Sequence, residues 1–277
     1  MGVAYYSALG PAIAGAHARG NGRRVAFITA GVVPALITAI AVGMWSHASP
    51  QVIVMNVGDG QAVLVRGPDG TILIDGGPSP ARLNAELGGQ LPPWQHSLDA
   101  LVITAPGLGH IGGLAGFDRL ATTVLLPQAD LTGSAWRTAA LEETARGASI
   151  ESLRAGRTLR LAGFELQVLA PEPGAPGDQT GAADLAVRIV APDGRSFCDL
   201  SDLDHDAQTV AAARLRGPCD ELLLPVGGRS RLSPDLDRKA VTATTQLIAS
   251  RGAGRLAAGY PPNVLRTDQE GTITLPL

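Results

Sequence analysis

The chain has little aromatic character and few cysteines or lysines. Aromatic residues make up 4% of its 277 positions, which argues against a surface on which the bases of single-stranded nucleic acid stack. Its net charge of −3 at pH 7 provides no overall attraction for nucleic acid. Lys239 is the one lysine, and the two cysteines, Cys198 and Cys219, stand in no CxxC or Cys/His spacing, which argues against a zinc knuckle.

Two interpretations of the cysteines remain open on the sequence alone. Cys198 and Cys219 can be two small buried hydrophobic residues. If the domain lies outside the cytoplasm, they can instead form a disulfide between neighbouring strands. The choice depends on the separation of their Cα atoms, which the sequence does not reveal.

A charge-free run near the N-terminus predicts a membrane anchor. The 45% hydrophobic content of the chain allows one sizeable core and a short appendage. Val25 to Trp45 contains no charged residue, and about 20 apolar residues suffice to cross a bilayer. Because Arg19, Arg23 and Arg24 precede the run, the positive-inside rule places everything after it outside the cytoplasm. We therefore predict a single-pass protein of the cytoplasmic (inner) membrane.

This prediction divides the chain into three parts: a cytoplasmic segment, 1–24, a transmembrane helix, 25–45, and an extracytoplasmic domain, 50–277. A cleaved signal peptide is an alternative, because Ser46-His47-Ala48 resembles a small-x-small cleavage site. The run and the segment before it are both long for that class. A buried core helix fits less well, because the run lacks the polar stripe of a surface-packed helix.

After Pro50 the pattern changes to short strands and helices. Apolar runs predict strands at 51–57, 62–66, 71–74, 98–104, 122–126, 164–169, 185–190, 195–200 and 221–225. Helical patterns follow at 111–120, 134–146, 207–215 and 239–250. The strands first come in bunches and then alternate with helices. This order predicts an α/β domain with two packed sheets and helices outside.

One segment has the frame of a binuclear metal site. The predicted strand 98–104 runs into a tight turn that ends in His110-Ile-Gly-Gly and leads into a helix. Metallo-β-lactamase-type hydrolases place H-x-H-x-D-H on such a turn, because a short bent segment can aim four side chains at two cations. In this chain the four ligand positions are Ala105, Gly107, Gly109 and His110. Alanine and glycine offer no lone pair to a metal ion, so the site looks emptied of ligands.

Six motifs in order carry a resemblance to a known family. The motifs are Asn56–Ala62 (like DVGQGDA), Leu73–Gly77 (LIDGG), Leu101–Leu114 (LVLTHxDxDHIGGL), Asp199–Asp202 (the end of LLTGD), Pro225–Ser230 (PHHGS) and Leu265–Ile273 (RTDxxGT). From Arg23 onward, the chain resembles the last membrane helix and the C-terminal metallo-β-lactamase-like domain of ComEC-type competence proteins. The resemblance implies a four-layer αββα sandwich preceded by one transmembrane helix. It also implies a role in DNA uptake and a site for two zinc or manganese ions.

The departures from the family cluster at the metal site. The resemblance retains two of its ligands, His110 and Asp202, whereas Val226 and Gly227 replace its histidine pair. Two donors fall short of the three protein ligands of an ordinary catalytic zinc site. We therefore expect no metal cofactor and no intact catalytic residue.

A few residues remain as vestigial candidates. The catalytic candidates are Asp75, His110 and Asp202, although Asp75 also suits the capping of a glycine turn. The weak metal candidates are His110, Asp202 and Asp59. The acid that opens the family's first motif is replaced by Asn56 in this chain, and Asp59 is an acid within the same motif. Carboxylates alone could recruit magnesium, which is satisfied by one or two of them together with waters.

Other polar residues have plainer interpretations. Arg229 and Arg231 are candidates for holding nucleic-acid phosphates, and the alternative is an arginine pair on an exposed loop. His205 suits the start of a helix better than a replacement metal ligand. Ser201 lacks the G-x-S-x-G elbow of a serine nucleophile.

Three hypotheses follow for the function. The first is a membrane-anchored, non-catalytic relative of the ComEC soluble domain, with the membrane, DNA and a ComEC-type channel or another uptake component as partners. The second is an active membrane-anchored metal-dependent hydrolase or nuclease with a reduced site. The third is a split or decayed part of a larger channel protein.

Overall fold

The computed structural model describes residues 33, 49–128, 138, 142–144, 146–175, 181–250 and 254–277. The chain forms two units, Met1–Ala48 and Ser49–Leu277. Apart from Val33, the predicted transmembrane helix lies outside the described residues, as does most of the predicted helix 134–146. Within the described ranges, no helix has the length and apolar character needed to span a bilayer.

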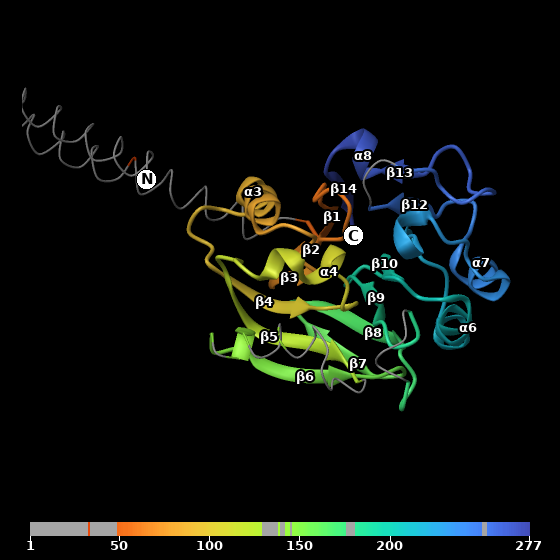
Figure 1. Cartoon of the computed structure of the whole chain (residues 1–277), viewed down its shortest axis with the longest axis horizontal. Coiled ribbons are helices and arrows are strands. Elements are labelled where there is room, and N and C mark those ends of the chain that lie inside the picture. Colours follow the sequence, from red (N-terminus) through yellow and green to blue (C-terminus); the bar gives the residue numbers. More distant parts are fainter. Residues whose placement is uncertain are drawn as a thin grey trace, which may run out of the picture. The chain divides into compact units, whose positions relative to one another are not determined.

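The first sheet of the second unit has seven strands in the order β14-β1-β2-β3-β4-β5-β6 (Figure 1). Its members are β1 (Gln51–Val54), β2 (Val63–Gly67), β3 (Gly70–Ile74), β4 (Ser97–Val102), β5 (Leu120–Pro127), β6 (Ser149–Leu153) and β14 (Ile273–Pro276). Strands β14 to β3 pair antiparallel, and β3 to β6 pair parallel. The C-terminal strand thus completes the sheet at the edge where the domain begins.

The second sheet also has seven strands, in the order β13-β12-β11-β10-β9-β8-β7. They are β7 (Thr158–Leu161), β8 (Phe164–Ala170), β9 (Ala186–Val190), β10 (Ser196–Asp199), β11 (Glu221–Leu223), β12 (Gln246–Ala249) and β13 (Leu265–Arg266). Strands β7 to β10 pair antiparallel, and β10 to β13 pair parallel.

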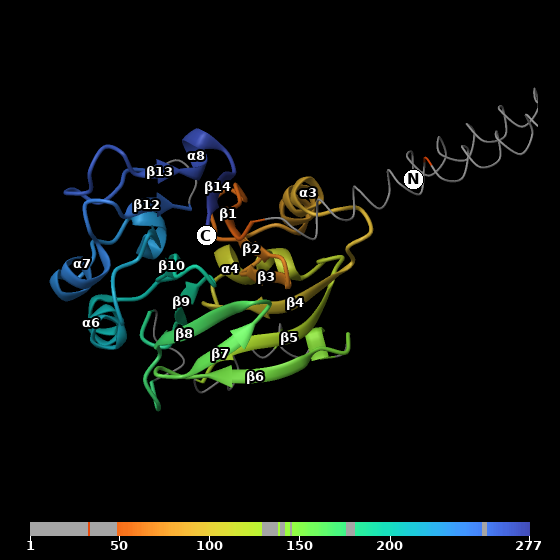
Figure 2. The same ribbon diagram turned by 180° about the vertical axis from the view of Figure 1, so that it is seen from behind.

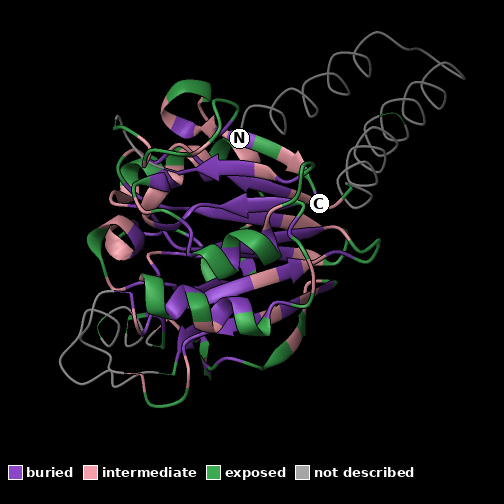
Figure 3. Cartoon of the chain, turned by 90° about the vertical axis from the view of Figure 1, so that its right-hand side faces the viewer, coloured by how far each residue is buried: buried purple, intermediate pink, exposed green. Residues whose placement is uncertain are grey.

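Three apolar clusters separate four layers. The central cluster lies between the sheets and includes Val52, Val54 and Phe197, whereas Ile53, which alternates with the two valines, faces the outer helices of the first sheet. The third cluster lies between the second sheet and its helices. Figure 3 shows the buried strands between more exposed helices. The structure is therefore a helix–sheet–sheet–helix sandwich, as predicted.

Short helices cover both outer faces (Figures 1 and 2). On the first sheet, α3 (Pro80–Gln90) begins with a proline and buries Leu83 and Leu87, which lie one turn apart. On the second sheet, α6 (His205–Arg214) and α7 (Pro234–Ala240) pack against each other. The Asp204 carboxylate caps α6 by accepting a hydrogen bond from the amide of Ala207. The remaining helices are α4 (Leu108–Ile111), η1 (Gly112–Leu114), η2 (Pro225–Gly228) and α8 (Thr267–Glu270).

Two of the predicted helices were wrong. The predicted helix 111–120 is reduced to α4 and η1, and β5 already begins at Leu120. The reason is tertiary: the amide of Gly113 donates to the carbonyl of Gly77 at 2.7 Å, and a Cβ at Gly113 would collide with the backbone of Gly76. The segment is thus held against the loop after β3 instead of continuing as a helix.

The predicted helix 239–250 is replaced by the end of α7, a turn and β12. Val241 leaves the helical region, with φ −103° and ψ 132°. Thr245 then accepts a hydrogen bond from the amide of Thr242 at 2.9 Å and donates one to the carbonyl of Cys219. Threonine hydroxyls that bond to nearby backbone compete with helix formation, and β12 gains a parallel partner in β11.

The two cysteines form a disulfide. Cys198 lies in β10 and Cys219 precedes β11, with their Cα atoms 5.9 Å apart. Both are buried in the cluster beneath α6 and α7. Of the two interpretations that the sequence left open, the disulfide is therefore the one that the fold brings about.

We expect loss of this disulfide to lower the free energy of unfolding. The two cysteines are 21 residues apart. Closing a loop of that size lowers the entropy of the unfolded chain, which raises the free energy of the unfolded state by about 3 kcal/mol at room temperature. Urea denaturation of the Cys198→Ala/Cys219→Ala variant measures the effect. Reduction of the wild type should lower its midpoint similarly, and an unchanged midpoint after reduction would contradict the prediction.

Candidate functional site

Polar side chains gather where strands of both sheets end. Asp75 follows β3, Thr104 follows β4, and Asp199 and Ser201 lie at the end of β10. The short helix α4 brings His110 to the same place. Because parallel strands end at one edge of a sheet, segments distant in sequence meet here.

Asp75 is the centre of this cluster and is fully buried. One carboxylate oxygen accepts from the amide of Thr104 at 2.8 Å. The other lies 2.5 Å from the hydroxyl of Thr104, 2.7 Å from Nδ1 of His110 and 3.1 Å from Nε2 of Gln61. The protein thus supplies several donors to a carboxylate that has no access to water, as a buried charge requires.

His110 connects two carboxylates. Its Nδ1 contacts Asp75 at 2.7 Å, and its Nε2 lies 3.2 Å from Asp202. Burial by itself lowers the pKa of His110, but the charge of Asp75 and the hydrogen bonds to Asp202 and Asp75 outweigh it, so the pKa lies well above 6.5. The resulting imidazolium donates from both nitrogens and places a positive charge between two acids.

Gln61 connects the first carboxylate to a second one. Its amide nitrogen lies 3.1 Å from Asp75 and 2.8 Å from Asp199. Burial, reinforced by the charge of Asp75, raises the pKa of Asp199 to about 7. Ser201 completes the connection, because its amide donates to Asp199 and its hydroxyl donates to Thr104, both at 2.8 Å.

Asp184 is a member of this locus that sequence reasoning missed. It is 3% exposed, and burial together with the charge of Asp202 raises its pKa to about 8. The signal in the sequence was a single acid two residues before the apolar strand β9. Only the approach of Asp184 to Asp202 and His110 in the folded chain makes it part of the site.

The backbone is strained at three positions of the site. Among the residues that the structure describes, four other than glycine have positive φ angles, and three of them, Asp75 (59°), Ser201 (49°) and Val226 (54°), lie at this edge. A β-branched residue such as Val226 is an outlier in this region. Such strain persists where surrounding structure enforces it and clusters at functional sites. The loop geometry is therefore retained although Val226 offers no ligand.

The emptied ligand positions are partly closed by a neighbouring turn. The amide of Gln61 donates to the carbonyl of Gly109 at 2.8 Å, which holds the turn of Gly58 to Gly60 against this loop. A Cβ at Gly109 would lie 3.3 Å from the carbonyl oxygen of Asp59, so a ligand side chain there requires the turn to move. Gly107 has more room, with Cδ2 of His110 nearest at 3.7 Å, whereas Ala105 is buried.

The side chains at this locus do not fit two catalytic metal ions. In the described part of the chain, no group of three or more His, Cys, Asp or Glu side chains is arranged to hold a metal ion. Both ring nitrogens of His110 are engaged, so binding a metal would require a contact with Asp75 or Asp202 to break. Gln61 presents a donor, not a ligand, to the buried carboxylates. A catalytic zinc ion uses three protein ligands, more than remain here.

The other predicted site residues lie outside this buried cluster. The side chain of Asp59 is 66% exposed and lies 4.0 Å from Arg229. Arg231 packs over Gly259 and lines a cavity with Tyr260, whereas Arg229 borders a different hollow. His205 is the first residue of α6, as predicted.

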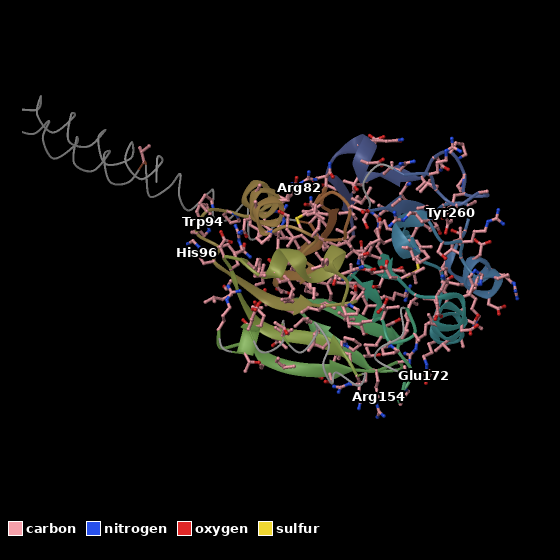
Figure 4. All side chains as sticks on the ribbon, viewed as in Figure 1. Arg82, Trp94, His96, Arg154, Glu172 and Tyr260 are labelled. Carbon is pink, nitrogen blue, oxygen red and sulfur yellow. A yellow bond between two sulfur atoms is a disulfide. The ribbon has the colours of Figure 1, made fainter. Side chains whose placement is uncertain are left out.

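Positive groups flank the turn above the cluster. Arg82, which Figure 4 labels, lies against Gly58, and Arg229 lies beside Asp59. Arg229 and Arg255 also border one shallow hollow. The rim of the site therefore offers guanidinium groups, whereas its buried part offers carboxylates and one imidazolium.

The fold has counterparts among solved structures. A new diphosphatase from the PhnP family aligns with 81% of this chain and 97% of its own length, with a TM-score of 0.52 and 12% identity. The metallo-β-lactamase fold protein YhfI from Bacillus subtilis aligns with 64% of this chain and 70% of its own, with a TM-score of 0.43 and 14% identity. No protein-family model and no curated protein matches the sequence. The domain from Ser49 to Leu277 thus has a metallo-β-lactamase-like fold.

We expect the free energy of unfolding to fall as pH rises from about 5 to 9. The pKa of Asp184 is raised from 3.8 to about 8, so between these values the folded state binds more protons than the unfolded state, and raising the pH removes stability. The raised pKa of His110 acts in the same direction. The Asp184→Asn variant should lose less stability over this range in urea denaturation at several pH values.

The control for this measurement is Asp59→Asn at the exposed rim of the same site. It should retain the pH dependence of the wild type. Equal slopes for Asp184→Asn and the wild type would show that Asp184 does not titrate in this window.

Proposed function

We propose that this protein is a membrane-anchored, non-catalytic relative of the soluble domain of ComEC-type competence proteins, which binds nucleic acid or another uptake component outside the cytoplasmic membrane. The carrying observation is that His110 and Asp202, the two retained ligands, contact each other at 3.2 Å. In this proposal, the ion pair and the amide of Gln61 replace the cations that stabilise the same edge in an active relative. The kinship rests on the six ordered sequence motifs and on the fold.

The extracytoplasmic location has independent support from the disulfide. Cys198 and Cys219 form a buried disulfide in the apolar cluster between the second sheet and its helices. Structural disulfides persist mainly in oxidising compartments. This agrees with the orientation predicted from the arginines before the charge-free run 25–45. Membrane anchoring itself follows from the sequence pattern alone.

The binding role is based on the charged rim. Arg82 lies beside Gly58 and Arg229 lies beside Asp59, in the turn that is packed against Gly109. Guanidinium groups bind phosphate through paired, charge-assisted hydrogen bonds. A phosphate of DNA at this rim would meet arginine where an active relative presents metal ions.

The metal content of the purified full-length chain tests the non-catalytic assignment. After exposure to zinc or manganese followed by dialysis, elemental analysis should find far less than one ion per chain, because His110 is engaged at both nitrogens. Phosphodiesterase activity should be absent with either metal.

The competing assignment is a hydrolase with a reduced site. It predicts stoichiometric metal together with an activity that both His110→Ala and Asp202→Ala abolish. Such a result would overturn the non-catalytic assignment. Activity that survives both substitutions would point to a contaminating enzyme.

A salt titration of DNA binding tests the role of the rim. With a short labelled oligonucleotide, Arg229→Gln should weaken binding and reduce the slope of log affinity against log salt by about 0.7 to 0.9, the contribution of one phosphate contact. Arg238→Gln is the matched control, because Arg238 is 72% exposed on α7 and pairs with Asp235. No affinity of the wild type for single- or double-stranded DNA at low salt would remove DNA as the partner.

A further inference from the structure

A second group of arginines lies at another corner of the domain, around the start of β7 and the end of α6. Arg157, Arg214 and Arg216 line a cavity of about 330 Å³, together with Thr158 and Gln167. This volume is at the small end of the range for ligand pockets. None of these residues belongs to the buried carboxylate cluster or to its rim. The cavity is therefore a separate candidate site.

Two of the three guanidinium groups are held in position by glutamates. Arg214 donates from both Nε and Nη2 to Glu172, at 2.8 Å and 2.6 Å. Arg157 donates from Nη2 to Glu151 at 2.6 Å. Arginine side chains lose considerable rotamer freedom when they are ordered, so positioning in the folded protein reduces the entropy lost when a ligand binds.

Both held arginines keep donors for a ligand. Arg214 uses Nε and Nη2 for Glu172, and its Nη1 lies over Gly156, where a Cβ would be 2.9 Å away. Gly156 has a φ of +87° and leaves the space that this guanidinium occupies. A guanidinium group has five N–H donors, and Arg157 donates to Glu151 from Nη2 only.

Arg216 is the third lining cation, and within the described ranges it makes no ion pair with a carboxylate. It is exposed and lies two residues after the end of α6. Thr158, which has a hydroxyl that can donate a hydrogen bond, lines the same cavity. Figure 4 places Arg154 and Glu172 at this corner, so a fourth arginine stands nearby. The corner therefore carries four arginines against two glutamates.

We propose that this cavity binds the phosphate group of a nucleotide-sized ligand. A tetrahedral dianion can accept hydrogen bonds from several guanidinium groups at once, and the planar fork of arginine matches its oxygens in pairs. The two glutamates set the positions of Arg157 and Arg214, and Arg216 supplies the charge that no carboxylate of the described chain neutralises. The inference does not depend on the proposed function, because it uses neither the carboxylate cluster nor Arg229.

Titration of the full-length chain with inorganic phosphate and with thymidine monophosphate tests this proposal by isothermal calorimetry. Sodium chloride at equal ionic strength is the reference. We expect saturable binding of both phosphate compounds, with at least a tenfold loss of affinity in Arg216→Gln. Arg216→Lys keeps the charge but not the paired donors, so it should restore affinity only in part. Thr158→Val should weaken binding less than Arg216→Gln does.

Two controls make the outcome specific. Arg238→Gln removes an exposed arginine elsewhere on the surface and should leave phosphate binding unchanged. Arg229→Gln tests the rim of the other site separately, because phosphate bound at the rim is lost in this variant while phosphate bound in the cavity remains. The proposal is overturned if phosphate gives no saturable signal beyond that of chloride, or if Arg216→Gln binds as the wild type does. Binding that Arg229→Gln abolishes would assign the phosphate to the rim instead.

Discussion

Buried carboxylates impose the main physical constraint on this domain. Asp75, Asp184 and Asp199 are at most 3% exposed, and an ionised carboxylate removed from water needs a positive partner or donors. In this chain His110, Gln61 and the hydroxyl of Thr104 meet that need. Burial raises the pKa of the carboxyl groups of Asp184 and Asp199, so these groups keep their protons to a higher pH. The edge is therefore stabilised by protons and hydrogen bonds.

Contacts within the protein also hold the loops around this cluster in place. The strained backbone at Asp75, Ser201 and Val226 and the turn packed on Gly109 are enforced by the ends of strands from both sheets. Neither feature needs a metal ion. Positive charge has instead gathered on the surface, at the rim with Arg82 and Arg229 and at the cavity with Arg216. The buried acids are thus separated from the exposed arginines that we propose bind phosphate.

The errors of the sequence analysis have one physical origin. The segments 111–120 and 239–250 have helical patterns. Hydrogen bonds to residues far away in the sequence prevent both of them from forming a continuous helix. Gly113 bonds to Gly77, and Thr245 bonds to Cys219. Strand β12 is apolar enough to be a buried helix or a buried strand, and only its pairing with β11 decides between them. Asp184 escaped notice for the same reason.

The sequence by itself determined the two-sheet α/β class, most strands, the order of the motifs and the replacement of ligands at Ala105, Gly107 and Gly109, because periodicity and residue chemistry are local properties. The tertiary structure decided that Cys198 meets Cys219 and that His110 lies between Asp75 and Asp202. It also decided that Arg157, Arg214 and Arg216 line one cavity. These outcomes depend on which strand and helix ends converge, and such distances arise only when segments far apart in the chain pack together.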